Sequence, residues 1–305
     1  MLLSLISIVQ LGTIDYATGL RLQEQILALR KEEKIGDVLL LLEHSPVITL
    51  GRNAKAANVV ASRELLERRG VELFECDRGG DVTFHGPGQL VGYPIFDLRG
   101  FPRSTSLSSR AESRDPVFRK HLGAVDFVRS LEEVLVRTCA DFSIPSKRVP
   151  GLTGVWTDDV AKGHDFSRAE ANSNVLSSRA EQEDSLANRR AESRDLLLAE
   201  AATNAAPEAK LAAIGVHISR FVTSHGFALN VNTDLSYFNL IIPCGITSKP
   251  VTSMQKELGR ELSLNAVAQS ISRNFGVIFQ SQILWVDTFD ALLSASGAGA
   301  LAQVP

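Results

Sequence analysis

The sequence contains few cysteines and no apolar run long enough to cross a bilayer. Its three cysteines, Cys76, Cys139 and Cys244, are odd in number and far apart. This spacing argues against a disulfide framework and a zinc knuckle, and it favours a reducing cytoplasm. The apolar start of the chain, residues 1–9, lacks the basic residues and the cleavage site of a signal peptide, so we expect a buried first strand there. No membrane partner is therefore expected.

The chain also lacks an excess of charge and the common nucleotide-binding motifs. Lysine and arginine total 32 against 35 aspartate and glutamate residues, a net charge of −3, which gives no basic field for nucleic acid. Gly86, Gly88 and Gly92 miss the G-x-G-x-x-G spacing, and no glycine loop is followed by a Walker lysine. We therefore expect no nucleic-acid partner, no cofactor and no metal.

A distinctive stretch is present at residues 78–98, which read R-G-G-D-V-T-F-H-G-P-G-Q-L-V-G-Y-P-I-F-D-L. Its glycines and Pro87 are turn residues, and the β-branched and aromatic residues between them are typical of short strands. Turns without side chains let a ligand lie against the main chain, and His85 would be presented at a corner. For the glycines alone, a hairpin that binds nothing is the simpler interpretation.

Two polar segments, at about residues 103–121 and 162–207, interrupt the pattern of helices and strands. Both contain a short S-R-A-E unit, whose period is too short for a solenoid repeat and which carries too few apolar residues to bury a face. We interpret them as disordered, low-complexity insertions in a single catalytic domain, residues 1–285. Residues 286–305 are expected to form a C-terminal tail.

Lys210 begins a run, K-L-A-A-I-G-V-H-I, whose alternation predicts a strand face shared by Lys210 and every second residue up to Ile218. A lysine at a strand end often extends past the apolar surface into water. In a partly buried position, its charged form would be stabilised by an adjacent thiolate, and a Lys–Cys pair could exchange a proton near neutral pH.

Cys244 follows Pro243 and precedes Gly245, so we expect its thiol in a turn at the end of an apolar strand, residues 240–242. Cys139 instead lies within the apolar stripe of a helix expected at 126–142, where it is a small core residue. Cys244 is thus the better candidate nucleophile, although spacing alone favours a turn residue without a catalytic role.

Six blocks of the sequence, taken in order, resemble the lipoyl(octanoyl) transferases. They are E-H-x-P-V, R-G-G-x-x-T-F-H-G-P-G-Q, G-L-T-G-V-W, K-x-A-A-I-G-V, H-G-F-A-L-N-V and F-x-x-I-x-P-C-G-I, spread from about residue 10 to about residue 280. The resemblance implies that Cys244 accepts the acyl group and that Lys210 activates the Cys244 thiol. It also implies an acyl pocket lined by Arg78, Gly79, Gly80, Asp81, Val82, Thr83, Phe84, His85, Ala213, Ile214, Gly215, Gly226, Phe227 and Ala228.

The fold implied by this resemblance is the α+β core of the biotin and lipoate protein ligases, a mixed β-sheet with flanking helices and a smaller sheet. The implied reaction transfers an octanoyl or lipoyl group from acyl carrier protein to a lysine, through a cysteine thioester, as the first step of protein lipoylation. The implied acceptors are the lipoyl domains of 2-oxoacid dehydrogenases and the glycine cleavage H protein. Two alternatives stay open: an ATP-dependent lipoate-protein ligase, and a catalytically silent acyl- or carrier-binding protein.

Overall fold

The structure of the chain is a computed structural model that describes residues 4–101, 121–158 and 208–295. The two expected insertions, apart from His121, and the last ten residues of the expected tail, 296–305, lie outside the described residues. Within the described ranges, no helix is long and apolar enough to cross a membrane.

Eight strands of the described residues form a large sheet, in the order β11-β1-β2-β6-β10-β9-β8-β7. The strand β1 pairs in parallel with β2 and β11, whereas the other pairings in this sheet are antiparallel. The sheet is therefore mixed, as expected. Its strands are β1 (Ser4–Ile14), β2 (Asp37–His44), β6 (Gln89–Ile95), β7 (Ser146–Val149), β8 (Leu152–Thr157), β9 (Lys210–Ser219), β10 (Val222–Asn230) and β11 (Ser281–Val286).

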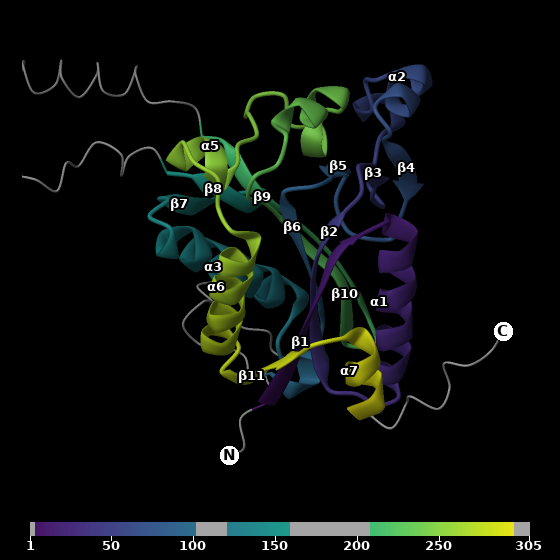
Figure 1. Ribbon diagram of the computed structural model, residues 1–305, viewed down its shortest axis with the longest axis vertical. Coiled ribbons are helices and arrows are strands. Elements are labelled where there is room, and N and C mark those ends of the chain that lie inside the picture. The colour runs from purple at the N-terminus through teal and green to yellow at the C-terminus, as the bar shows by residue number, and fades with distance from the viewer. Residues whose placement is uncertain (1–3, 102–120, 159–207, 296–305) are drawn as a thin grey trace, which may run out of the picture. The chain divides into compact units, whose positions relative to one another are not determined.

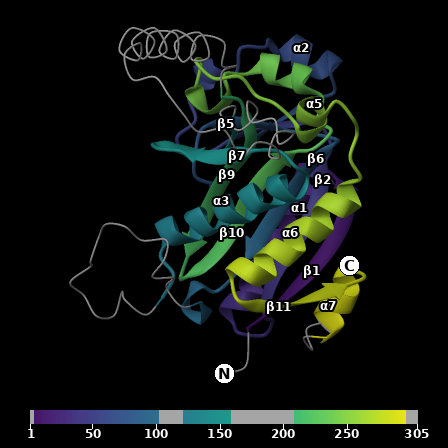
Figure 2. The ribbon, with the colours of Figure 1, turned by 90° about the vertical axis from the view of Figure 1, so that its left-hand side faces the viewer.

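Helices cover both faces of this sheet, because strand side chains point alternately to opposite faces. In β2, Leu39 and Leu41 pack in the apolar cluster shared with α3 (Ala124–Asp141) and α6 (Leu264–Ile278). The alternate residues Val38, Leu40 and Leu42 pack in the cluster shared with α1 (Tyr16–Lys31). Figures 1 and 2 show α1 on one side of the sheet and α3 and α6 on the other.

The C-terminal part of the fold extends further than the sequence predicted. The strand β11 ends at Val286, and the helix α7 (Phe289–Ala295) follows it. Leu292 and Leu293 are each only 4% exposed, and Leu292 belongs to the cluster beneath α1. The expected start of the tail at residue 286 is therefore wrong, because apolar residues in the Ala- and Ser-rich sequence pack α7 onto the sheet.

A second, smaller sheet has the strand order β4-β3-β5. Its apolar cluster includes Val82 and Phe84 from β5 together with Phe238 and Leu240 from the 3₁₀ helix η4. Figure 1 shows this sheet beside α2. The elements of this part are β3 (Val47–Leu50), β4 (Glu72–Glu75), β5 (Val82–His85), α2 (Arg63–Arg68), η1 (Ala56–Asn58), η4 (Leu235–Leu240) and η5 (Pro243–Gly245). Two further short helices, η2 (Leu98–Gly100) and α5 (Met254–Leu258), bury Leu98 and Met254 in the cluster of the large sheet.

Candidate active site

A lysine and a cysteine that lie 34 positions apart in the sequence are in contact. The Nζ atom of Lys210 lies 3.2 Å from the Sγ atom of Cys244. Lys210 is only 7% exposed and Cys244 is half-buried. The same Nζ lies 5.1 Å from the centroid of the Trp156 ring, a cation–π distance. The pair therefore combines an amine and a thiol in direct contact, largely shielded from solvent.

Lys210 reaches Cys244 because of an irregularity in β9. Val155 pairs with Ala212, but the next residue of β8, Trp156, pairs with Lys210, so Leu211 is an extra residue in β9. This bulge places Lys210 on the face of Trp156 and Ala213, not on the face of Ala212. The predicted face shared by Lys210, Ala212 and the residues up to Ile218 is therefore wrong at Lys210, because the bulge shifts the alternation by one residue.

The backbone of Lys210 is also joined to the segment that follows Cys244. The N–H of Lys210 donates to the carbonyl of Pro250 (2.8 Å), and the N–H of Thr252 donates to the carbonyl of Lys210 (3.0 Å). These bonds fix the first residue of β9 against residues that are close to Cys244 in the sequence. The contact between the two side chains thus rests on backbone pairing as well as on side-chain packing.

Cys244 lies in the short 3₁₀ helix η5, with φ at +55° and ψ at 20°. This left-handed conformation is uncommon for a residue other than glycine and is typical of strained functional positions. The N–H of Ile242 donates to the carbonyl of Asn58 (2.7 Å), and the Asn58 amide donates to Asp81 Oδ2 (2.5 Å). A second expectation, an apolar strand at 240–242, is wrong: η4 ends at Leu240, Ile241 makes only an isolated antiparallel bridge with Val59, and Leu240 and Ile241 pack into the small-sheet cluster.

The residues after Arg78 are held in place by that arginine, which is only 8% exposed. Its Nη2 donates to the carbonyls of Thr49 and Asp81, each at 2.7 Å, and to Thr49 Oγ1 at 2.8 Å, while Nη1 donates to the carbonyl of Gly79 at 3.1 Å. The guanidinium therefore binds carbonyl and hydroxyl oxygens and leaves a positive charge in the wall of the site. Its main action is to hold the turn 78–81 against β3.

Cys244 and the pocket segments expected from sequence surround one narrow cavity. Of the expected residues, Arg78, Gly80, Asp81, Thr83, His85, Ala213, Ile214, Gly215, Gly226, Phe227 and Ala228 line it. Gly79, Val82 and Phe84 do not. Val82 and Phe84 are turned to the other face of β5, into the small-sheet cluster, as the two-residue period of a strand requires.

Four further residues line the cavity that the sequence did not indicate: Tyr16, Val91, Tyr93 and His225. They come from α1, β6 and β10. Val91 lies opposite Ala228 in the sheet, so the pairing of β6 with β10 brings them together. His225 begins the H-G-F-A-L-N-V block, and Val91 and Tyr93 lie in the distinctive stretch 78–98, whereas Tyr16 carried no sequence signal.

His85, at the cavity wall, is held in its neutral form. Its Nδ1 lies 2.7 Å from Gln89 Oε1. Since the Gln89 amide nitrogen donates to Phe84 O and Asn230 Oδ1, Oε1 accepts and His85 Nδ1 donates. Burial, together with the positive charge of Arg78, lowers the pKa of His85 to about 3.

His44 is likewise buried and neutral. Its Nδ1 donates to the carbonyl of Ile14 (3.1 Å), so its Nε2 accepts from the Tyr93 hydroxyl (2.6 Å). Burial lowers the pKa of His44 to about 4 and raises the pKa of Tyr93, which keeps the hydroxyl proton in this bond. The tyrosine at the cavity wall is therefore fixed by a histidine behind it.

Asp77 connects a buried histidine of the cavity to the surface. Its Oδ1 lies 2.6 Å from His225 Nε2, and its Oδ2 contacts His217 Nδ1. Burial lowers the pKa of His225, against the opposing effect of Asp77. Burial raises the pKa of Asp77, but the hydrogen bonds that Asp77 accepts from His225 and His217 outweigh burial. The pKa of Asp77 is therefore lowered from its usual value. Among the described residues, no group of three or more His, Cys, Asp or Glu side chains could hold a metal ion.

The sequence matches the family model of the lipoyl protein ligase A/B catalytic domain over residues 15–276. The chain therefore belongs to this family, as the six blocks predicted. Within it, the chain is similar to proteins named octanoyltransferase. One from Koribacter versatilis is 50% identical over 95% of this chain and 90% of its own length, and one from Acidobacterium capsulatum is 46% identical over 94% and 96%.

Solved structures show the same fold at low sequence identity. A bipartite lipoate protein ligase from Thermoplasma acidophilum matches with a TM-score of 0.56 at 12% identity, over 100% of this chain and 99% of that chain. A lipoate-protein ligase A bound with ATP matches with a TM-score of 0.55 at 12% identity, over 97% and 93%. The expected α+β ligase-like fold is thereby confirmed.

Proposed function

We propose that the chain is an octanoyltransferase that carries the acyl group on Cys244. The observation that carries this proposal is the 3.2 Å contact between Lys210 Nζ and Cys244 Sγ at a narrow cavity. A thiolate is the reactive form of cysteine, and an adjacent amine can take the thiol proton. Relatives named octanoyltransferase, which are 50% and 46% identical and align over at least 90% of both chains, support this activity.

The reaction has two acyl-transfer steps. In the first, Cys244 Sγ attacks the carbonyl carbon of an octanoyl thioester on acyl carrier protein, Lys210 holds the thiol proton, and the carrier leaves as its free thiol with that proton. In the second, the ε-amine of an acceptor lysine attacks the Cys244 thioester. An amide forms, the C–S bond breaks, and the amine proton passes by way of Lys210 to the cysteine sulfur. The acceptor lysine belongs to a lipoyl domain of a 2-oxoacid dehydrogenase or to the glycine cleavage H protein.

The cavity lining suits an acyl chain that is bonded to Cys244. Apolar side chains and bare glycine backbone from β9 and β10 form one wall, including Ile214, Gly215 and Phe227. Gly226 cannot be replaced without rearrangement, because a Cβ there would lie 2.1 Å from the carbonyl oxygen of Gly92. Arg78 and the turn that it holds also line the cavity, next to Gly215.

An ATP-dependent ligase is less well supported. The likeness to a ligase bound with ATP is at 12% identity and concerns the fold. Transfer from one thioester to another is nearly balanced in free energy, and transfer from a thioester to an amide is downhill, so the proposed reaction needs no ATP. A silent binding protein would have no need for the Lys210–Cys244 contact.

Intact-mass spectrometry tests the proposal. After incubation with octanoyl-acyl carrier protein and no ATP, we expect one octanoyl adduct that hydroxylamine removes. The adduct should be absent from Cys244→Ala protein and present on Cys76→Ala protein, since Cys76 does not line the cavity. An adduct on Cys244→Ala protein, or none on the parent, would overturn the proposal.

A further inference from the structure

A wide groove lies on the side of Cys244 away from the narrow cavity. It consists of two depressions with volumes of about 570 and about 640 Å³, against about 50 Å³ for the narrow cavity. The depressions share Leu235, Ser236 and Lys256 in their walls, so they form one continuous surface. We call it the outer groove. Its walls are η4, the segment 242–251 and the start of α5.

The outer groove leads to the Lys210–Cys244 pair. A small hollow lined by Lys210 and Cys244 shares Phe238, Pro243 and Val251 with the outer groove. The same hollow shares Cys244 and other residues with the narrow cavity. Cys244 therefore stands between a narrow cavity and a wide groove.

A thioester has two arms, one on each side of the carbon that Cys244 attacks. If the acyl arm occupies the narrow cavity, the thiol arm must leave by another opening. The outer groove is that opening, and it is wide enough for a chain with amide groups. This step rests on the proposed function.

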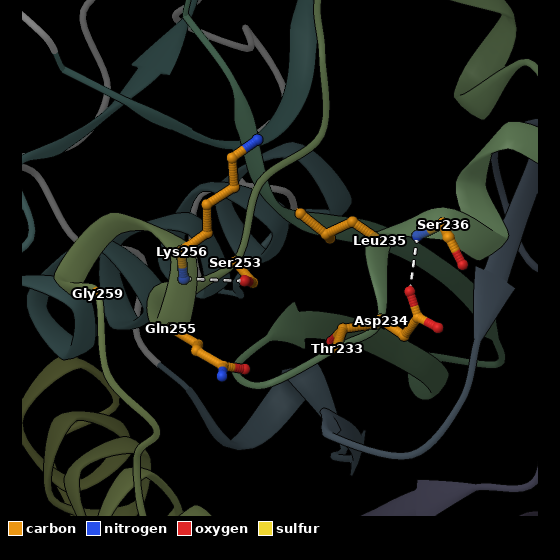
Figure 3. A pocket seen from close by; sticks show the side chains of 8 residues that line it. All are labelled: Thr233, Asp234, Leu235, Ser236, Ser253, Gln255, Lys256 and Gly259. Atoms are coloured by element: carbon orange, nitrogen blue, oxygen red, sulfur yellow. Dashed lines mark hydrogen bonds between the residues drawn. The ribbon is translucent and has the colours of Figure 1, made fainter.

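Two lysines are among the described residues that line the outer groove. Lys256 is exposed and lines both depressions. Lys249 lines the depression next to Pro243, and its Nζ lies 5.7 Å from the Trp156 ring centroid. Figure 3 shows the Lys256 side chain extending away from Asp234.

The lining residue Asp234 forms a hydrogen bond within its own segment. Asp234 lines the other depression, and its Oδ1 accepts from the N–H of Ser236 (2.9 Å). Among the described residues that line the groove, the depression next to Pro243 thus has two lysines, and the carboxylate of Asp234 lines only the other depression. A thiol arm with one anionic group along its length would fit this arrangement.

We propose that the outer groove binds the phosphopantetheine arm of the carrier, with its phosphate at Lys256 and Lys249. The acyl chain then lies in the narrow cavity, the thioester lies at Cys244, and the amides of the arm lie along η4 and the segment 242–251. The phosphate is the group of this arm that lysine recognises as a point charge.

Two small thioesters test this assignment without the carrier protein. Octanoyl-4′-phosphopantetheine and octanoyl-pantetheine differ only in the phosphate, and acylation of Cys244 is followed by intact mass. For the parent protein, we expect kcat/KM to be about tenfold higher with the phosphate, the lower end for a charge-assisted hydrogen bond. The ratio of the two values should fall in Lys256→Gln, in which Lys249 remains, fall further in Lys256→Glu and be retained in Lys256→Arg.

The matched control is Lys34→Gln, because Lys34 is exposed, follows α1 and pairs with Glu32; its ratio should equal that of the parent. A parent ratio of one, or an unchanged ratio in both Lys256→Gln and Lys256→Glu, would overturn the groove assignment and leave the proposed function intact. Acylation of Cys244 by neither thioester nor by the octanoylated carrier would instead refute the proposed function.

Discussion

Acidification should destabilise this protein steeply because it buries two neutral histidines. The pKa of His44 is lowered to about 4 and that of His85 to about 3, whereas a histidine in an unfolded chain titrates near 6.5. Below pH 6.5 the unfolded chain binds a proton on each of these residues, and the folded protein does not until pH approaches 4 or 3. The free energy of unfolding therefore falls as the pH falls through this window.

The magnitude follows from the proton uptake. Each such group contributes a slope of about 1.4 kcal/mol per pH unit below pH 6.5, so each should cost about 2 kcal/mol between pH 7 and pH 5. The two together amount to about 4 kcal/mol, a large part of the roughly 5–15 kcal/mol that stabilises a typical domain. Other groups titrate in the same range, so a single residue must be isolated by comparison.

Urea unfolding at pH 7 and pH 5 provides that comparison. In His85→Asn protein, the loss of unfolding free energy between the two pH values should be about 2 kcal/mol smaller than in the parent. Val82→Ala is the control, because Val82 is fully buried on the other face of the same strand. It should be less stable by roughly 1–3 kcal/mol at both pH values, with the pH effect of the parent. If His85→Asn kept that pH effect too, the neutral state of His85 would be refuted.

Three further outcomes are expected. Lys210→Met should slow alkylation of Cys244 by iodoacetamide at pH 7 by roughly 10- to 100-fold, because it removes a charge-assisted contact of about 1.5–3 kcal/mol; an unchanged rate would mean that the lysine does not hold the thiolate. Gly92→Ala should lower the thermal midpoint, since its Cβ would lie 2.2 Å from the ring of Phe227 and overpacking costs about 1–3 kcal/mol; a parent-like midpoint would show that the ring moves freely. Burial raises the pKa of Cys139 to about 12, so peptide mapping should find it labelled by iodoacetamide only in urea, and labelling in the native state would contradict its position in the core.

Local signals in the sequence are sufficient to predict several elements of the fold. Asp15 and Ser62 cap α1 and α2, each accepting from an N–H of the first turn, as residues of this type before a helical stripe predict. The continuous aliphatic run before His44 is buried on both faces. These features depend on residues close in sequence, so they can be inferred without the tertiary structure.

The cavity wall could be predicted only in part, because its composition depends on which strands are neighbours. Tyr16 and Tyr93 lie outside the six blocks, and they reach the cavity through the pairing of β2, β6 and β10 and the packing of α1 on them. Val82 was expected in the pocket, since it lies within a matching block, but the block does not indicate which side chains point inward. The alternation of side chains along β5 shows which of them point into the cavity.

The two residues proposed for chemistry both occupy irregular backbone, which a rule of regular alternation cannot predict. A bulge turns Lys210 toward the cavity side of the sheet, and Cys244 has a left-handed φ. The bulge is held from both sides: Thr157 exchanges hydrogen bonds with Ala209 just before it, and Lys210 exchanges backbone bonds with the segment after Cys244. The chain thus leaves the sheet at Thr157 and returns at Ala209 with its register already fixed by neighbours on either side. A long segment between these two residues is compatible with a well-placed lysine, because the position of Lys210 depends on pairing with β8 and with residues 250–252 and not on the length of chain that precedes it.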